Sequence, residues 1–197
     1  MSLSLGACKN NDSKATAEAA DNSANAAIEC IMTRSSVREY DPEHAVSADT
    51  VETILRAAMA APTAVNSQTW EFIVVNEREA LDSLSAALPR AKMLATAPLA
   101  IVTCGNLGRA LQGEGQGFWI QDVSAATENL LLAAHALGLG AVWTGVYPSQ
   151  ERVEAVQKHF NLPDSIIPLA VVPMGYPVAP ANIKDKWKPE YIHNNRW

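Results

Sequence analysis

Two stretches of this chain say most about its fold and its site: Arg34-Ser35-Ser36-Val37-Arg38 and Pro62-Thr63-Ala64-Val65-Asn66-Ser67-Gln68-Thr69-Trp70. The first places guanidinium groups beside hydroxyls, a combination that suits a phosphate group. The second places uncharged amides on a loop that leads into an apolar strand. Because amides both donate and accept hydrogen bonds, they suit the edge of a polar ring.

A single ligand with both a phosphate and a polar heteroaromatic ring would account for the two stretches, and flavin mononucleotide (FMN) is such a ligand. The alternative is an exposed helix end followed by an ordinary turn. Short basic motifs occur often by chance, and Asn is common in turns. These residues alone therefore leave both interpretations open.

The composition is that of a globular chain. Of its 197 residues 48% are hydrophobic and 18% are charged, which is enough to bury a core. The net charge of −6 argues against a broad basic surface for nucleic acid. The longest apolar runs, near 130–139 and 166–172, are too short to span a bilayer, so we expect no transmembrane segment. The cysteines form no CxxC pair and the histidines are scattered, so no metal site is predicted.

The N-terminal residues 1–25 differ from the domain expected over 26–197. Residues 9–25 are mostly Ala, Asn, Asp, Ser and Lys, which predicts a polar spacer. Before them stands Leu5-Gly6-Ala7-Cys8, which resembles a bacterial lipoprotein cleavage box with a lipidated Cys. A truncated lipoprotein spacer would explain the tail, and a harmless tail is the alternative. We expect a cytoplasmic protein, or a lipid-anchored one at the cell envelope if Cys8 is modified in the native full-length protein.

The hydrophobic pattern predicts alternating helices and strands. Helices are expected at 26–33, 47–60, 77–88, 91–96, 118–137 and 150–160. Strands are expected at 70–76, 99–104, 141–146 and 166–174. The helix 118–137 is apolar around much of its circumference, which predicts burial in the domain centre or at a subunit interface.

Three further segments bear on function. The glycine-rich residues 106–117 predict a mobile loop. The segment Gly138 to Gly145 leaves a helix and enters a strand, the reverse of a dinucleotide-binding GxGxxG motif, and Gly145 would let a flat ring lie on the backbone. Lys92 could stabilise negative charge on a reduced flavin, or it could be a solvated surface lysine. The last twenty residues carry aromatic side chains without a helical pattern, so we expect them to pack against something.

Taken together and in order, these segments resemble the FMN-dependent nitroreductase family. The resemblance covers Ile28 to Trp197 and rests on 34–38, 61–70, 128–134, 138–145, 175–177 and Arg196-Trp197. It implies an α+β fold with a central, mostly antiparallel sheet flanked by helices. It also implies an intertwined homodimer in which the C-terminal extension adds a strand to the other subunit's sheet.

The resemblance further implies two FMN sites at the dimer interface. The phosphate would be held by Arg34, Ser36 and Arg196, with Ser35 in the same stretch. The polar edge of the ring would be faced by Arg38, Lys92 and Gln68. The partner subunit would contribute Pro62, Thr63 and Asn66. The backbone near Trp143, Thr144 and Gly145 would meet flavin N5, and the candidates to stack on substrate are Phe118 and Trp119.

This chain departs from the family pattern at two of these places. Thr69 stands where the family often has Pro, which should change the rigidity of the loop more than its chemistry. Thr144 stands where many members have an acidic residue near N5. Donation from the backbone survives that change, but the polarity of the pocket changes with it.

The implied activity is that of an FMN-dependent oxidoreductase with a ping-pong mechanism. NADH or NADPH would give a hydride to flavin N5 and leave, and a small aromatic electron acceptor such as a nitroaromatic or a quinone would then be reduced. No catalytic side chain is required, because the cofactor carries the chemistry. Two alternatives are a protein of the same fold with another reaction, such as reductive dehalogenation or flavin cleavage, and a non-enzymatic dimeric flavin-binding module.

Overall fold

The computed structural model describes residues 25–197, which fall into two units that we describe separately, one ending at Arg34 and one running from Ser35 to Trp197. The described part of the first unit is a helix at 25–33, which confirms the helix expected at 26–33. Its last turn is closed by Arg34, whose backbone N–H donates to the Cys30 carbonyl at 3.1 Å. Cys8 and nearly all of the expected polar tail lie outside the described residues.

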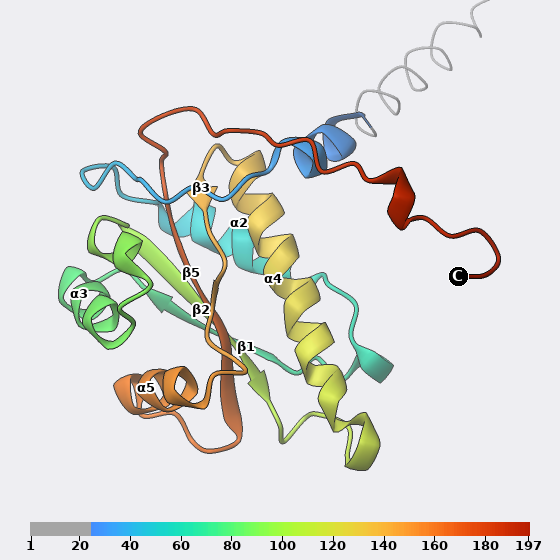
Figure 1. Ribbon diagram of the computed structural model, residues 1–197. Coiled ribbons are helices and arrows are strands. Elements are labelled where there is room, and N and C mark those ends of the chain that lie inside the picture. Colours follow the sequence, from blue (N-terminus) through green and yellow to red (C-terminus); the bar gives the residue numbers. More distant parts are fainter. Residues whose placement is uncertain (1–24) are drawn as a thin grey trace, which may run out of the picture. The chain divides into compact units, whose positions relative to one another are not determined.

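A five-stranded sheet forms the centre of the second unit (Figure 1). Along the sheet the strands are β1 (Trp70–Val75), β2 (Leu99–Asn106), β5 (Ile166–Gly175) and β3 (Gly140–Ala141), and β4 (Thr144–Gly145) also pairs with β5. Every one of these pairings is antiparallel. The predicted α+β class with a mostly antiparallel sheet is therefore confirmed.

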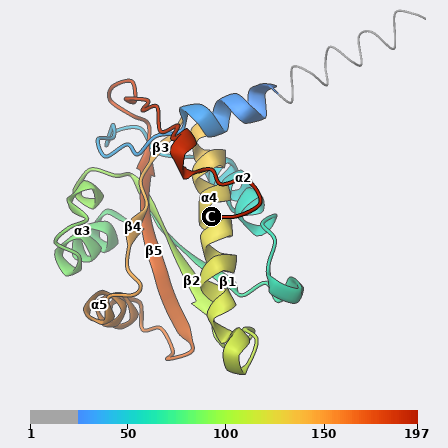
Figure 2. The ribbon, with the colours of Figure 1, turned by 45° about the vertical axis from the view of Figure 1, so that its right-hand side comes forward.

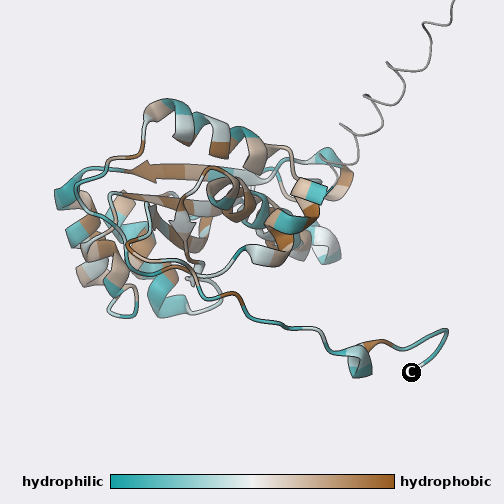
Figure 3. Ribbon diagram, turned by 90° about the horizontal axis from the view of Figure 1, so that it is seen from above, coloured by the Kyte–Doolittle hydropathy of each residue, from teal (hydrophilic) through white to brown (hydrophobic). Residues whose placement is uncertain are grey.

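Helices cover both faces of the sheet (Figure 2). One face carries α2 (Ala48–Met59) and α4 (Phe118–Ala136), and the other carries α3 (Arg78–Ala87) and α5 (Gln150–Phe160). Strand β2 explains why both faces can be covered. Its alternate residues Ala100, Val102 and Cys104 belong to the core under α3 and α5, whereas Leu99 and Ile101 belong to the core under α2 and α4. Figure 3 shows the same concentration of hydrophobic residues along the strands.

The structure confirms the long predicted helices and changes two short elements. The segment expected to be helical at 91–96 is a 3-10 helix, η2 (Lys92–Ala95). The strand expected at 141–146 is split into β3 and β4, although both keep one register against β5. The gap lies opposite Pro173. The Pro173 carbonyl accepts from the Val142 N–H at 3.3 Å, but the Pro173 nitrogen carries no hydrogen and cannot donate the second hydrogen bond of the pair. A proline in a central strand therefore interrupts the ladder.

The C-terminal segment leaves the sheet after β5 (Figure 1). It holds no strand within this chain, only a 3-10 turn, η4 (Pro189–Tyr191). Its aromatic side chains are exposed, with 67% of Trp187, 76% of Tyr191 and 99% of Trp197 accessible to solvent. The sequence predicted that these side chains pack against another surface, but within a single chain they remain exposed.

No helix among residues 25–197 is both long enough and apolar enough to cross a membrane.

Candidate functional site

The loop that precedes β1 has an unusual backbone. It contains a 3-10 turn, η1 (Ala64–Asn66), and the residues Val65, Asn66 and Gln68 have φ angles of 48°, 57° and 49°. Side chains other than glycine rarely adopt such left-handed conformations, because Cβ crowds the backbone. Three of them within four positions require support from elsewhere in the fold.

That support comes from Asp122 on α4, which is only 4% exposed. Its Oδ1 accepts from the Ala64 N–H at 2.8 Å, and its Oδ2 accepts from the hydroxyls of Ser67 at 3.3 Å and Thr69 at 3.0 Å. Among residues 25–197 no salt bridge involves this carboxylate. A buried carboxylate is tolerated only where hydrogen bonds replace its hydration. Asp122 therefore fixes the loop to α4.

The two loop amides contact each other. Gln68 Nε2 donates to Asn66 Oδ1 at 3.2 Å, and both residues are exposed. The Gln68 backbone N–H donates to Thr63 Oγ1 at 3.1 Å, which fixes the direction of the loop at that point. The remaining amide groups of Asn66 and Gln68 thus form one polar edge with both donors and acceptors.

A cavity of about 340 Å³ lies beside β4. Its lining includes Thr144 and Gly145, the segment Ala87 to Ala91, and the beginning of α5. A Cβ built on Gly145 would meet no atom within 4 Å, so open space lies over this backbone. Thr144 Oγ1 is buried and has no hydrogen-bond partner among residues 25–197. An orphaned hydroxyl beside an uncovered glycine indicates a place for a flat ligand with polar atoms.

One side chain of α5 supports this backbone. Arg152 Nη1 donates to the Gly145 carbonyl oxygen at 3.0 Å. The sequence did not single out Arg152, because the contact joins a helix and a strand and leaves no local pattern. The same holds for Asp122, whose only signal is an acidic residue on the apolar side of a buried helix.

The stretch Ser35-Ser36-Val37 reaches the edge of the sheet that holds β3 and β4. Ser36 forms a bridge with Ala141 of β3, and the Val37 N–H donates to the Ala141 carbonyl at 3.0 Å. Ser35 Oγ is buried without a hydrogen-bond partner in the described part of the chain. The structure thus attaches Ser36 and Val37 to β3, close in sequence to Trp143, Thr144 and Gly145. Arg34 belongs to the other unit.

A buried phenol completes the attachment of this stretch. Tyr40 is 3% exposed, and its hydroxyl lies 2.7 Å from the Val37 carbonyl oxygen and 3.0 Å from that of Pro173. Burial raises the pKa of Tyr40 above its ordinary value, with a small opposing effect from Arg38. The phenol therefore stays protonated and can donate to either carbonyl.

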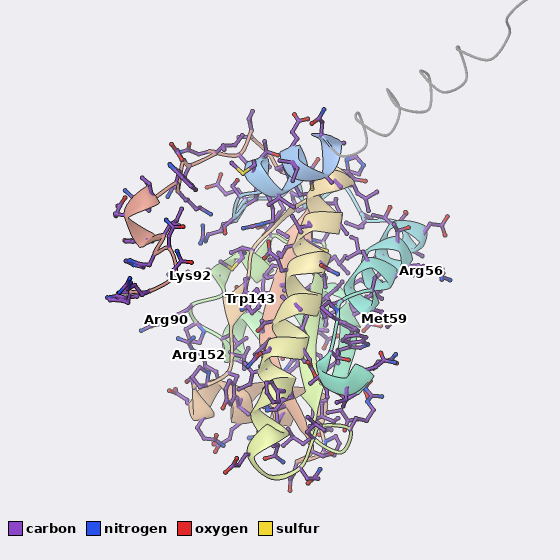
Figure 4. All side chains as sticks on the ribbon, turned by 90° about the vertical axis from the view of Figure 1, so that its right-hand side faces the viewer. Arg56, Met59, Arg90, Lys92, Trp143 and Arg152 are labelled. Carbon is purple, nitrogen blue, oxygen red and sulfur yellow. The ribbon has the colours of Figure 1, made fainter. Side chains whose placement is uncertain are left out.

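The other predicted residues lie apart from the cavity or at its border. Lys92 and Arg38 are exposed, as is Pro62. Figure 4 shows Lys92, Arg90 and Arg152 on the side of the molecule that carries Trp143. Arg196 is exposed in the C-terminal segment and lines neither cavity described here.

The two candidates for stacking on substrate have different surroundings. Phe118 is 44% exposed, whereas Trp119 is 5% exposed and packs over Gly105. Trp119 makes an edge contact with Tyr147, with ring centroids 5.1 Å apart, and lines a second cavity of about 420 Å³. Neither lines the cavity that holds Thr144 and Gly145. Their role stays a prediction.

No group of three or more potential metal ligands occurs within the described range 25–197.

Comparison with known proteins yields consistent matches. The profile of the Nitroreductase family matches residues 31–91 and 82–176. A protein of Methanothermobacter thermautotrophicus, provisionally named NADH dehydrogenase/NAD(P)H nitroreductase, is 44% identical over 170 residues, covering 86% of this chain and 87% of that protein. A crystal structure from Parabacteroides distasonis with the same provisional name has a TM-score of 0.82 and 44% identity, covering 87% of this chain and 98% of that one. An FMN-dependent nitroreductase of Clostridium difficile has a TM-score of 0.78 and 27% identity, covering 86% and 99%.

The antiparallel sheet between two helical layers, with a cavity beside a glycine at its edge, defines an α+β protein with open space at the edge of its sheet. The profile match and the relatives at 44% identity specify the class further. The chain belongs to the nitroreductase family, as the resemblance in its sequence predicted.

Proposed function

We propose that this protein is an FMN-dependent oxidoreductase that takes reducing equivalents from NADH or NADPH and passes them to a nitroaromatic, a quinone or a similar conjugated acceptor in a ping-pong cycle. The observation that carries the proposal is the open space over Gly145 beside the orphaned Thr144 hydroxyl. A side chain at position 145 would fill the space that a flat ring needs. Within a fold of this family, those features fit the ring of FMN.

When bound, FMN supplies hydride acceptance from the nicotinamide and hydride delivery to the acceptor. The protein has to bind and orient. Thr144 and Gly145 provide the backbone surface for the ring, and Arg152 holds that surface through the Gly145 carbonyl. Lys92 and Arg38 would contribute positive charge near the polar edge of the ring, where a cation stabilises developing negative charge.

The amides of Asn66 and Gln68 are assigned here to one flavin. The sequence resemblance divided them between the two subunits. Because Gln68 Nε2 donates to Asn66 Oδ1, the two side chains form one edge, which favours joint contact with the same ring. Asp122 would act as a positioning residue, since it touches the loop and not the ligand.

The phosphate is assigned to Arg34, Ser35, Ser36 and Arg196. The buried, unpartnered hydroxyl of Ser35 supports this assignment, since it lacks an acceptor or donor within the described residues. Arg196 lies in the exposed C-terminal segment. It can therefore contact the phosphate only if that segment takes another position in the assembled protein.

We propose a homodimer that brings this about. The exposed Trp187, Tyr191 and Trp197 are the kind of aromatic surface that association buries. A tail that exchanges between subunits would cover these side chains and carry Arg196 to the partner's flavin. Phe118 and Trp119 are proposed as candidates for contact with the acceptor.

The decisive experiment is an absorption spectrum of the full-length protein after incubation with FMN and removal of free flavin. We expect a yellow protein that bleaches when NADH or NADPH is added without oxygen and regains its colour when a quinone or nitroaromatic is added. A protein that retains no flavin contradicts the proposal. A flavoprotein that is not bleached by either nicotinamide indicates another reaction on the same fold.

A further inference from the structure

The cavity beside Gly145 carries two arginines. Arg90 stands just before η2 and Arg152 lies in the first turn of α5, and both side chains contribute to the lining. Figure 4 shows them on the same side of the molecule as Lys92. These cations come from two separate elements, so the fold brings them together.

Their charges are not neutralised by the rest of the chain. Within residues 25–197, neither Arg90 nor Arg152 forms a salt bridge. Glu151 also lines the cavity, which leaves two guanidinium groups against one carboxylate. Arg152 uses Nη1 for the Gly145 carbonyl and has further N–H groups to donate. The lining therefore has an excess of positive charge and unused donors.

This positive lining stands out against the charge of the whole molecule. The chain has a formal net charge of −6, so its overall field does not attract anions. An anion is attracted only at such a local group of cations. A guanidinium matches a carboxylate, sulfonate or phosphate with two parallel hydrogen bonds. Arg90 is exposed, whereas Arg152 is partly buried, which strengthens the attraction of Arg152 for an anion.

We propose that Arg90 and Arg152 form an anion subsite that selects flat electron acceptors bearing a carboxylate or a similar anionic group. The inference rests on the proposed function, because it specifies the class of acceptor used by that same site. At about 340 Å³ the cavity lies at the lower end of the range of roughly 300–1,000 Å³ found for ligand pockets. Because the flavin ring is assigned to the Thr144 and Gly145 side of this cavity, only a small acceptor such as a single-ring aromatic acid would fit in the part beside Arg90 and Arg152.

The test compares two acceptors of matched size, para-nitrobenzoate and para-nitrobenzamide, in the FMN-loaded protein. The variant Arg90→Gln removes the charge and keeps much of the side-chain length. We expect the ratio of kcat/KM for the benzoate to that for the benzamide to fall about tenfold, which is typical for loss of one charge-assisted hydrogen bond. Arg90→Lys should recover most of the ratio. Arg56→Gln is the matched control, because Arg56 is an exposed arginine on α2, outside the cavity.

A binding measurement removes the dependence on turnover. Benzoate and benzamide, which cannot be reduced, are titrated into the FMN-loaded protein while the flavin absorption spectrum is recorded. The dissociation constant for benzoate should rise about tenfold in Arg90→Gln and should rise with salt in the unchanged protein. Arg152→Gln removes the second charge and should also raise the dissociation constant for benzoate, with the spectrum of bound FMN as a check that the backbone at Gly145 is intact.

The outcomes separate the possible sources of the anion. An unchanged benzoate to benzamide ratio in Arg90→Gln overturns the inference. A loss of FMN affinity in place of the change in ratio assigns the arginines to the FMN phosphate and overturns it as well. A change confined to the preference for NADPH over NADH, measured as the ratio of their kcat/KM values, assigns the arginines to binding of the hydride donor and also overturns the inference. In each of these cases a protein that still bleaches with NAD(P)H leaves the proposed function standing.

Discussion

Removal of the Asp122 carboxylate is expected to release the loop that precedes β1. In Asp122→Ala three donors lose their acceptor: the Ala64 N–H and the hydroxyls of Ser67 and Thr69. A hydrogen bond to a charged group contributes about 1.5–3 kcal/mol, and the hydroxyl of Thr69 is on a fully buried residue. The loss is partly offset, because Val65, Asn66 and Gln68 can leave their left-handed conformations, and each then releases about 1 kcal/mol of backbone strain. We expect a net change of about 3 kcal/mol in the free energy that holds the loop.

This change predicts a specific loss of cofactor. If FMN binds only the ordered loop, about 3 kcal/mol corresponds to a rise of about a hundredfold in the dissociation constant for FMN. Asp122→Asn should be milder, about 1 kcal/mol, because one oxygen can still accept from Ala64 and hydroxyls can accept from the new amide. The expected order of affinity is therefore wild type, then Asn, then Ala.

The assay is a fluorescence titration of FMN into flavin-free protein, with hydrogen exchange of residues 63–69 measured in parallel. Gln121→Ala is the control, since Gln121 is the exposed neighbour of Asp122 on α4 and should change little. If Asp122→Ala binds FMN as tightly as the control and its loop amides remain equally protected, then Asp122 does not hold the loop and our account of the left-handed residues is wrong.

Three further predictions use the same structure. Gly145→Val should change the free energy of unfolding, measured in urea, by no more than about 0.5 kcal/mol, because a Cβ there meets no atom. It should nevertheless strongly weaken FMN binding. A variant that loses stability as well as FMN affinity would contradict the open space over Gly145. Light scattering should find the full chain dimeric and the chain without residues 178–197 monomeric, and a truncated protein that remains dimeric would locate the interface elsewhere. Burial raises the pKa of Cys104 from 9.0 to about 12, so its thiol should resist alkylation at mildly alkaline pH until the protein is unfolded. Because this folded-state pKa is raised, the stability from Cys104 is complete below pH 9.0 and is lost as the pH rises toward about 12, which urea titrations at several pH values would detect.

The sequence predicts the regular elements because their signals are local. The apolar spacing of α4 and the Ser47 cap of α2, whose Oγ accepts from the Thr50 N–H at 3.2 Å, are both visible without a structure. The split between β3 and β4 is not, since it depends on Pro173, which lies opposite Val142 only after β5 has paired.

The candidate site divides in the same way. The sequence alone is enough to propose Gly145 and the amides of Asn66 and Gln68, because the absence of a side chain and the presence of donor and acceptor groups are properties of the residue type. The left-handed conformations of the loop and their attachment to Asp122 depend on contacts between residues more than fifty positions apart, as the separation of Ala64 and Asp122 illustrates. Arg152 is missed for the same reason.

Strand β1 has a further consequence. It pairs with β2 along one edge, and within the described chain no strand covers its other edge. An open edge of a sheet is a template for the next strand that arrives, whether or not it comes from the correct molecule. If the proposed homodimer covers this edge with the C-terminal segment of the partner, a subunit that has not yet assembled is exposed to aggregation. Rapid assembly after synthesis then becomes a condition for solubility, and we expect defects in association to appear as insoluble protein before they appear as lost activity.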